Sequence, residues 1–378
     1  MRIALVAGET SGDILGADLL KSLKQRFPKV EFLGIAGPLM QAEGMQSMAE
    51  MDKLSIMGLE GLRKSLREIL SIRRQLISYL IDNPPDLFIG IDAPDFNLTV
   101  EERLRKAGIP VVHYVSPTVW AWRKYRIRKI RRAVDLMLTL FPFEKTFYQQ
   151  HDVPVEFVGH PLTAEIQPKK VDIMYRGNYA SDKQMLIAVL PGSRTSEIRA
   201  LGPLFIDVMR ELNKDGDGVQ FIIPTVTSKL RRLFKGFLDT NDGNFIHLVD
   251  GSESRRAMSA SDMVLLASGT AALEAALLAK PMVVAYKLSW LTYFFAKATT
   301  TVKHASMPNH LLEKPIVPEY IQLAASKNNL ITEIRRYMQD DELREQTSQK
   351  LAEIHPQLAY DSSELAVDAI EELLSKKQ

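Results

Sequence analysis

Two turns in the second half of the sequence combine small residues with groups that bind phosphate. A buried-type strand at 186–190 ends in a Pro-Gly-Ser-Arg turn, and another at 263–267 ends in Ser-Gly-Thr. Such strand–turn–helix connections present backbone N–H groups and a helix N-terminus to an anion. Arg194 adds a planar, permanently charged donor that suits a diphosphate, and the Glu274 carboxylate could accept hydrogen bonds from ribose hydroxyls. The two turns predict one nucleotide-diphosphate pocket, formed by Gly192, Ser193, Arg194, Ser268, Gly269, Thr270 and Glu274.

Carboxylates follow a buried-type strand in the first half of the sequence. The strand at 86–91 ends in Asp92-Ala93-Pro94-Asp95. Residues just past the carboxyl end of a parallel strand face the crevice in which α/β proteins bind ligands. One of these aspartates could act as a general base that takes a proton from a substrate hydroxyl. Asp92 is nearest the strand end and is the better candidate, although Asp and Pro are also common in ordinary turns.

The first strand, at 3–7, leads into a Gly-Glu-Thr-Ser-Gly-Asp turn. Gly12 permits close backbone approach, and Asp13 is expected to cap a helix that begins at Ile14. The turn lacks the Gly-x-Gly-x-x-Gly spacing of a dinucleotide site, so an NAD fingerprint is not supported. An ordinary strand–helix turn is the alternative.

Metal chemistry has little support in the sequence. The chain has no cysteine, and its 7 histidines form no H-x-x-H pair. The Asp-x-Asp string at 215–217 lies in a polar turn rather than at the carboxyl end of a strand. We therefore expect neither a metal nor a cofactor.

A helical pattern over residues 59–80 places apolar side chains on a stripe roughly 120° wide, with basic residues at its flanks. A core-facing helix explains most of this pattern, and a basic amphipathic helix on a membrane surface is the alternative. That alternative assigns membrane contact to Leu62, Leu66, Ile69, Leu70 and Arg73. A basic run at 123–132 could contact lipid headgroups or nucleic acid, but a solvated helix face is the simpler explanation.

The elements that must position these residues follow from the apolar pattern. Short apolar runs alternate with longer amphipathic ones in two successive sets, which predicts an α/β protein with two doubly wound, parallel-sheet domains. We expect domains at 1–160 and 161–350 and a final helical segment at 351–378. The 378 residues, 46% hydrophobic and 25% charged with a net charge of +2, are typical of a soluble globular protein. No apolar run approaches the ~18 residues of a membrane span, and no signal peptide precedes the first strand, which favours the cytoplasm.

Several strings resemble the lipid A disaccharide synthase family. In chain order they are GETSGD at 8–13, GIDAPDF at 90–96, HYVSPTVWAW at 113–122, PFEK at 142–145, PGSR at 191–194, ASGTAALE at 267–274 and Pro308-Asn309. The resemblance implies a glycosyltransferase of the GT-B fold. In that fold two Rossmann-like domains face a cleft, and the C-terminal helix crosses back to the N-terminal domain.

The reaction that the resemblance implies joins UDP-2,3-diacylglucosamine to 2,3-diacylglucosamine 1-phosphate in a β-1,6 linkage. It inverts the anomeric carbon, releases UDP and needs no metal. By position, Asn309 would join the nucleotide pocket, and Asp92 would activate the acceptor hydroxyl. Glu9 and Asp95 would belong to the catalytic group with Asp92, and Ser11 and Gly12 would lie on the acceptor side. The acyl chains imply peripheral contact with the cytoplasmic face of the inner membrane. The resemblance does not imply nucleic acid as a partner, and it leaves open whether the protein forms a homodimer.

Two other classes of protein fit parts of the sequence. Another UDP-sugar enzyme of the same fold, such as a UDP-GlcNAc 2-epimerase or an N-acetylglucosaminyltransferase, would share the nucleotide pocket but leave the 59–80 stripe buried. A two-lobed binding protein would share the architecture without needing a carboxylate at position 92. Asp92 and Asp95 stay alternatives as the general base.

Overall fold

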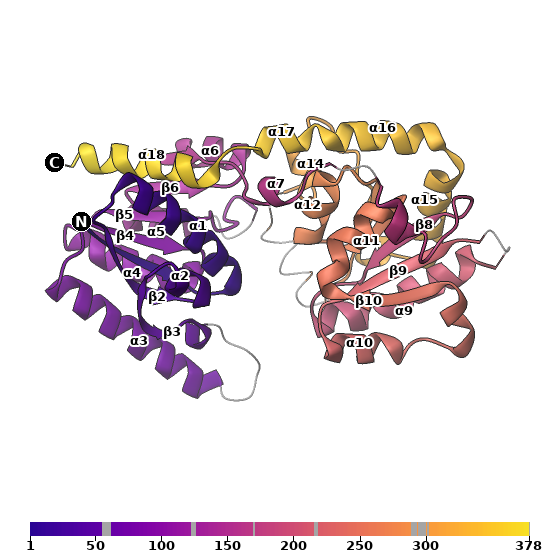
Figure 1. The fold of residues 1–378 in the computed structure, drawn as a ribbon, viewed down its shortest axis with the longest axis horizontal. Coiled ribbons are helices and arrows are strands. Elements are labelled where there is room, and N and C mark those ends of the chain that lie inside the picture. The colour runs from indigo at the N-terminus through magenta and orange to yellow at the C-terminus, as the bar shows by residue number, and fades with distance from the viewer. Residues whose placement is uncertain are drawn as a thin grey trace. The chain divides into compact units, whose positions relative to one another are not determined.

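The computed structural model describes residues 1–54, 62–121, 126–168, 171–214, 218–288, 293, 300 and 302–377 (Figure 1). The chain forms two compact units. The first comprises Met1–Pro161 and Leu358–Gln378, and the second comprises Leu162–Gln357. In the described part of the chain, no helix combines the length and the apolar character that crossing a bilayer requires.

A seven-stranded parallel sheet forms the centre of the first unit. Its strands are β1 (Arg2–Ala7), β2 (Glu31–Ala36), β3 (Gln46–Glu50), β4 (Leu87–Ile91), β5 (Val111–Tyr114), β6 (Leu136–Thr139) and β7 (Val155–Phe157). Their spatial order is β3-β2-β1-β4-β5-β6-β7. The order reverses between β1 and β4, so the turns after these two strands leave the same edge of the sheet side by side.

Helices cover this first sheet, and one of them comes from the far end of the sequence. They are α1 (Thr10–Arg26), α2 (Pro38–Ala42), α3 (Leu62–Asp82), α4 (Pro94–Lys106), α5 (Ile127–Ala133), α6 (Pro142–Gln149) and α18 (Ser362–Ser375), with the 3-10 turn η1 (Met51–Leu54). The yellow α18 in Figure 1 packs on α1. Arg26 pairs with Asp368 at 2.8 Å and also with Glu371, while Ala366 and Ile370 are buried in the core.

The second unit is built around a six-stranded parallel sheet. Its strands, in the spatial order β10-β9-β8-β11-β12-β13, are β8 (Leu186–Leu190), β9 (Gln220–Thr225), β10 (Ile246–Asp250), β11 (Met263–Ala267), β12 (Met282–Tyr286) and β13 (Glu319–Ile321). The order reverses between β8 and β11. These are the strands whose turns were predicted to bind phosphate.

The helices of the second half alternate with its strands. They are α7 (Leu162–Glu165), α8 (Ile173–Arg176), α9 (Thr195–Leu212), α10 (Ser228–Lys235), α11 (Ser254–Ala260), α12 (Thr270–Leu277), α14 (Pro308–Leu311), α15 (Lys327–Gln339), α16 (Asp341–Ala352) and α17 (Ile354–Leu358), with the 3-10 turns η3 (Thr240–Asn244), η4 (Gly251–Glu253) and η5 (Gln322–Ala324). The predicted α/β class with two doubly wound parallel sheets is confirmed. Two strands at sheet edges, β3 and β13, were not predicted.

The structure corrects the predicted start of α1 and the role of Asp13. The helix begins at Thr10 rather than Ile14, so Asp13 lies inside it and does not cap it. The Asp13 side chain is buried and accepts hydrogen bonds from the backbone N–H groups of Leu39 at 2.9 Å and Met40 at 3.1 Å. These are first-turn donors of α2, which no other side chain caps among the described residues. Asp13 therefore ties α1 to α2.

We expect Asp13→Ala to lower the free energy of unfolding by about 1–2 kcal/mol, because it removes the acceptor of two helix-start N–H groups. Asp18→Ala is the matched control on the same helix. Asp18 makes an exposed pair with Lys21, and its loss should cost less than about 0.5 kcal/mol. Urea denaturation followed by circular dichroism measures both. Equal losses in the two variants would contradict the assigned role.

Candidate active site

The first predicted phosphate turn follows β8. Gly192 has φ 123°, and a Cβ there would lie 2.5 Å from the Glu197 side chain, so the position requires glycine. The N–H groups of Ser193 and Arg194 donate to Oε2 of Glu197 at 2.9 and 3.1 Å. This carboxylate occupies two donors that the sequence assigned to a diphosphate. A phosphate bound at their N–H groups would have to displace Glu197. The Arg194 side chain is 76% exposed and pairs with the same Glu197 at 3.5 Å, so its guanidinium is accessible to a phosphate but already faces a carboxylate.

The second predicted phosphate turn follows β11, which pairs directly with β8. Gly269 has φ 152°, and no described atom lies within 4 Å of the place where its Cβ would be, so the turn is open above it. Thr270 begins α12, and no described side chain caps this helix. Ser268 donates from its hydroxyl to the carbonyl of Ala305 at 2.7 Å. The start of α12 thus offers uncapped backbone donors at an open turn, which suits a phosphate.

Glu274 lies in the second turn of α12, and its side chain is largely buried. Its Oε1 accepts a hydrogen bond from Nε of Arg255 at 3.1 Å. The Nη1 of Arg255 donates to Oε2 of Glu165 at 2.5 Å. The predicted ribose-binding carboxylate is therefore held by an arginine that the sequence analysis did not single out.

Asn309, the remaining residue of the implied nucleotide pocket, has its side-chain amide hydrogen-bonded within the protein. The residue is buried, its Nδ2 donates to the carbonyl of Val317 at 2.9 Å and to Glu319 at 2.7 Å, and its Oδ1 accepts from two backbone N–H groups at 3.0 Å. It does not cap α14, whose N-cap is Met307. With its amide engaged inside the protein, Asn309 holds the segment before β13 in place.

In the first unit, the turns after β1 and β4 touch each other. A Cβ on Gly8 would lie 2.6 Å from the Cβ of Ala93, so only glycine lets the two turns approach this closely. Glu9 and Ser11 are exposed at this edge, whereas Gly12 is buried against the strand ends. Glu9 is the N-cap residue of α1, but its side chain accepts no capping hydrogen bond. The structure thus brings the Gly8–Gly12 turn next to the turn of Asp92.

The backbone at Asp92 is strained. Asp92 and Ala93 have φ values of 50° and 44°, which non-glycine residues rarely adopt. The N–H of Asp92 donates to the carbonyl of Tyr114 at 2.8 Å, and Nδ2 of Asn97 donates to the carbonyl of Asp92 at 2.8 Å. Strain of this kind persists only where the surroundings hold it, and it clusters at functional sites. Here the strain lies at a half-buried aspartate, at the edge where the first sheet reverses its strand order.

Asp95 has a different environment from Asp92. Its side chain is 82% exposed and pairs with Arg126 at 2.7 Å, and its backbone carbonyl accepts from Arg73 at 3.3 Å. The Asp95 carboxylate is thus engaged by Arg126, whereas no described side chain pairs with the Asp92 carboxylate. The two predicted bases therefore differ in their surroundings, with Asp92 half-buried at the strand end and Asp95 exposed in an ion pair.

A buried ion pair that was not predicted from the sequence lies behind the Asp92 turn. Nδ1 of His113 is 2.6 Å from Oε1 of Glu101, and both side chains are fully buried. Burial lowers the pKa of His113, but the charges of Glu101 and Asp92 outweigh it and raise the pKa above its usual value. Glu101 packs on Gly90 of β4, where no Cβ could fit. Asn97 and Glu101, four residues apart on the buried face of α4, were the signal available in the sequence.

A second buried carboxylate anchors the segment after β5. Glu144 accepts from Nε1 of Trp120 at 3.0 Å and from the N–H of Phe141 at 3.2 Å, and Ser116 bonds Tyr148 at 2.9 Å beside it. Burial raises the pKa of Glu144 to about 8, against hydrogen bonds that favour the charged form. This network gives the PFEK and HYVSPTVWAW strings a structural role in the same unit.

The stripe on α3 divides between core and solvent. Leu76 and Leu80 are buried and Ile69 packs against the core, whereas Leu66 and Leu70 are 42% and 36% exposed. Arg73 is half-buried. Leu62 begins the helix, but its side chain lies outside the described residues, as does Leu59. The core-facing interpretation thus holds for the C-terminal end of the stripe, whereas Leu66 and Leu70 are exposed to solvent.

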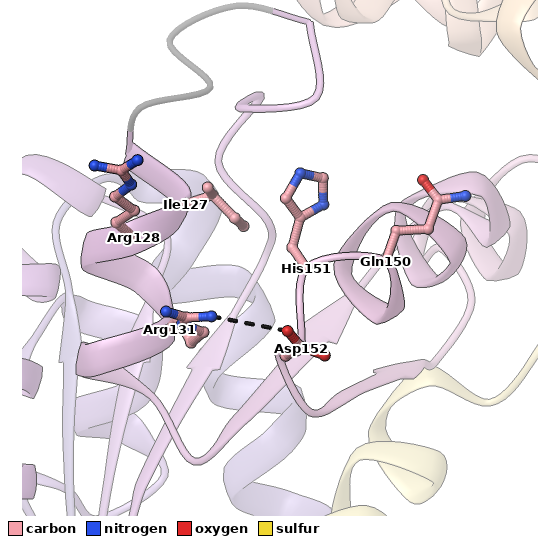
Figure 2. Close-up of a pocket in the computed structure, with 6 residues that line it drawn as sticks. All are labelled: Ile127, Arg128, Arg131, Gln150, His151 and Asp152. Carbon is pink, nitrogen blue, oxygen red and sulfur yellow. Dashed lines mark ion pairs between the residues drawn. The ribbon is translucent and has the colours of Figure 1, made fainter.

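A shallow pocket between α5 and the end of α6 lies apart from these residues (Figure 2). It is lined by Ile127, Arg128, Arg131, Gln150, His151 and Asp152. Arg131 faces Asp152 at 3.8 Å, in an exposed ion pair. Elsewhere in the basic run, Arg126 and Arg132 pair with carboxylates. Three of the described arginines of this run therefore face carboxylates of the protein.

Solved structures with the same architecture show the fold class of the chain. A Staphylococcus aureus MnaA–UDP co-structure matches with a TM-score of 0.65 and 15% identity, over 99% of this chain and 97% of that chain. A UDP-GlcNAc 2-epimerase from Neisseria meningitidis, bound to UDP-GlcNAc, matches with a TM-score of 0.62 and 15% identity, over 98% and 100% of the chains. The fold is that of the GT-B glycosyltransferases and epimerases, as predicted.

Sequence comparisons define the family within this class. The model of the lipid-A-disaccharide synthetase family matches residues 3–370. Lipid-A-disaccharide synthases from Chromohalobacter salexigens and Pseudomonas putida are 47% and 45% identical, over 99% of this chain and 97% and 99% of their own lengths. The chain belongs to the lipid-A-disaccharide synthetase family, which confirms the resemblance seen in the sequence. It is an enzyme, a glycosyltransferase of lipid A biosynthesis.

The Glu144 carboxyl predicts a pH dependence of stability. Burial raises the pKa of Glu144 in the folded protein to about 8, above the ordinary value of 4.5. The contribution of the protonated Glu144 carboxyl to the free energy of unfolding is therefore fully present below pH 4.5 and is lost as the pH rises to 8. In the Glu144→Gln variant this side chain is uncharged at every pH. The variant should therefore lack the fall in the free energy of unfolding with rising pH, which is at most about 1.4 kcal/mol per pH unit. Urea denaturation from pH 5 to 8 measures it. Glu156→Gln, at a carboxylate that is 46% exposed, should keep the wild-type slope. A wild-type slope in Glu144→Gln would refute the assignment.

Proposed function

We propose that the enzyme joins UDP-2,3-diacylglucosamine to 2,3-diacylglucosamine 1-phosphate through a β-1,6 linkage. The acceptor's 6-hydroxyl oxygen attacks the anomeric carbon of the donor sugar from the side opposite the diphosphate. The C1–O6 bond forms as the bond from C1 to the diphosphate oxygen breaks, and its electron pair leaves with UDP. The proton of the hydroxyl passes to a carboxylate of the enzyme. A single displacement of this kind inverts the anomeric carbon.

The second unit would hold the nucleotide. Its open, uncapped turn at Ser268–Thr270 would receive the diphosphate, with Arg194 from the neighbouring turn after β8. Glu274 would accept the ribose hydroxyls. The cationic and backbone donors would stabilise the negative charge that grows on the departing diphosphate. Asn309 would act indirectly, through the segment it holds.

The first unit would hold the acceptor, with Asp92 as the general base. The observation that carries this assignment is the strained, half-buried Asp92 at the point where the first sheet reverses its order. The Gly8–Gly12 turn, with Glu9 and Ser11 exposed on it, would line the acceptor side. Asp95, paired with Arg126, would contribute to this surface without taking the proton.

The rival function is that of a UDP-GlcNAc 2-epimerase, which shares the fold. The epimerases match at about 15% identity, whereas the synthases match at 45–47% over nearly the whole chain. A strand-end carboxylate poised to deprotonate a hydroxyl also suits transfer to an acceptor. These two observations favour the transferase.

The diacylated substrates would be met at a membrane surface. We place the enzyme at the cytoplasmic face of the inner membrane, bound peripherally. Leu66 and Leu70, exposed on α3 with Arg67 and Arg74 on the same helix, would contact the lipid. Arg73 and Ile69, turned partly toward the protein, would support them.

We expect Asp92→Asn to reduce transfer by about 10²–10⁴-fold while UDP still binds with wild-type affinity, because only the proton acceptor is lost. The assay mixes both diacylglucosamine substrates with purified enzyme and quantifies the disaccharide by mass spectrometry. Asp95→Asn, the matched carboxylate on the same turn, should lose less than about tenfold. Full activity in Asp92→Asn would mean that another group takes the proton.

The membrane proposal predicts that the double variant Leu66→Ser/Leu70→Ser binds anionic phospholipid vesicles at least about tenfold more weakly, since it removes apolar area that would enter the bilayer. Vesicle co-sedimentation gives the partition constants. Tyr79→Ser is the control, because Tyr79 is 41% exposed on the same helix but points elsewhere around it. Equal weakening by Tyr79→Ser, or none by the double variant, would count against this surface.

A further inference from the structure

Arg255 occupies a position between two carboxylates in the second unit. It lies on α11, donates from Nε to Oε1 of Glu274 at 3.1 Å, and donates from Nη1 to Oε2 of Glu165 at 2.5 Å. Glu274 comes from α12 and Glu165 from α7, so the guanidinium joins three helices. Its own side chain is 40% exposed, while that of Glu274 is only 18% exposed.

This arrangement fixes the Glu274 carboxylate in one orientation. A guanidinium is planar, and with one nitrogen held by Glu165 its Nε can meet Glu274 only from one side. Within the described residues, Oε2 of Glu274 forms no hydrogen bond with the protein. One oxygen of the carboxylate is therefore engaged, and the other keeps its full capacity to accept hydrogen bonds.

We propose that Arg255 is a positioning residue for nucleotide recognition, which holds the Glu274 carboxylate so that its second oxygen receives the ribose hydroxyls of the donor. This inference rests on the proposed role of Glu274. Without Arg255 the carboxylate would rotate among its rotamers, and ordering it would cost part of the binding free energy. Arg255 would thereby set the preference of the enzyme for a ribonucleotide.

A packing bridge between α11 and α12 is the competing explanation, and the neighbouring arginine provides its control. Arg256 lies on the same helix and pairs with Asp172 at 2.8 Å, with its guanidinium 4.4 Å from the ring centre of Tyr175. It has similar contacts but does not touch Glu274. Loss of Arg256 therefore measures the general effect of removing an arginine bridge from α11.

The test compares the binding of UDP, 2′-deoxy-UDP and 3′-deoxy-UDP by isothermal titration calorimetry, using the full chain. A hydroxyl bound to a charged acceptor should make the wild type favour UDP over the weaker deoxy nucleotide by about 10–100-fold. In Arg255→Gln this preference should fall below about threefold, with partial recovery in Arg255→Lys and an intermediate value in Glu165→Gln. Arg256→Gln should keep the wild-type preference.

The outcomes separate the inference from the function on which it rests. If Glu274→Gln loses the preference but Arg255→Gln and Arg255→Lys both keep it, Arg255 is only a packing bridge and the inference is wrong. If Glu274→Gln itself keeps the wild-type preference, the ribose assignment fails, and the inference fails with it. An equal loss in Arg256→Gln would also overturn the inference, since the effect would then be structural. Thermal unfolding of each variant shows that binding is measured on folded protein.

Discussion

The reversal of strand order in each sheet is the constraint on which the site depends. In a parallel sheet each segment that connects two strands packs on one face of the sheet. Only where the strand order reverses do the segments that follow two neighbouring strands pack on opposite faces. The turns after β1 and β4 separate there in the first unit, as do those after β8 and β11 in the second. The candidate groups for catalysis and nucleotide binding lie on these four turns or on the helices that follow them, with the exception of Asn309 on α14. The fold thus selects the positions, and the residue types supply the chemistry.

Much of this could be predicted from local sequence, and the exceptions have physical causes. Buried parallel strands are continuous apolar runs, so the central strands and the turns after them were found. The edge strands β3 and β13 were missed because neither has a fully buried side chain. Asp13 was assigned to the wrong helix because its partners, Leu39 and Met40, lie 26 and 27 residues away. A helix cap supplied by a residue distant in the sequence produces no local sequence pattern.

The contacts that refine the site were beyond sequence reasoning for the same reason. Glu197 occupies the N–H groups of the first phosphate turn, and Arg255 engages Glu274, yet neither residue stands out from its neighbours in the sequence. The fully buried pair of His113 and Glu101 is also instructive. Burying an ion pair is costly, and a well-packed apolar pair often replaces one without loss of stability. Its location directly behind the strained Asp92 backbone gives a reason for retaining it.

The return of α18 to the first unit affects how the protein is made. This helix contributes buried side chains to the core of a unit whose other residues are translated before the second unit. Domains generally fold during synthesis in the order in which they emerge. Here the first unit emerges early but must wait, with the surface of α1 uncovered, until the whole second unit has been translated. All residues of the second unit are translated before the last residues of the first unit. The first unit, although its synthesis begins earlier, is therefore completed last.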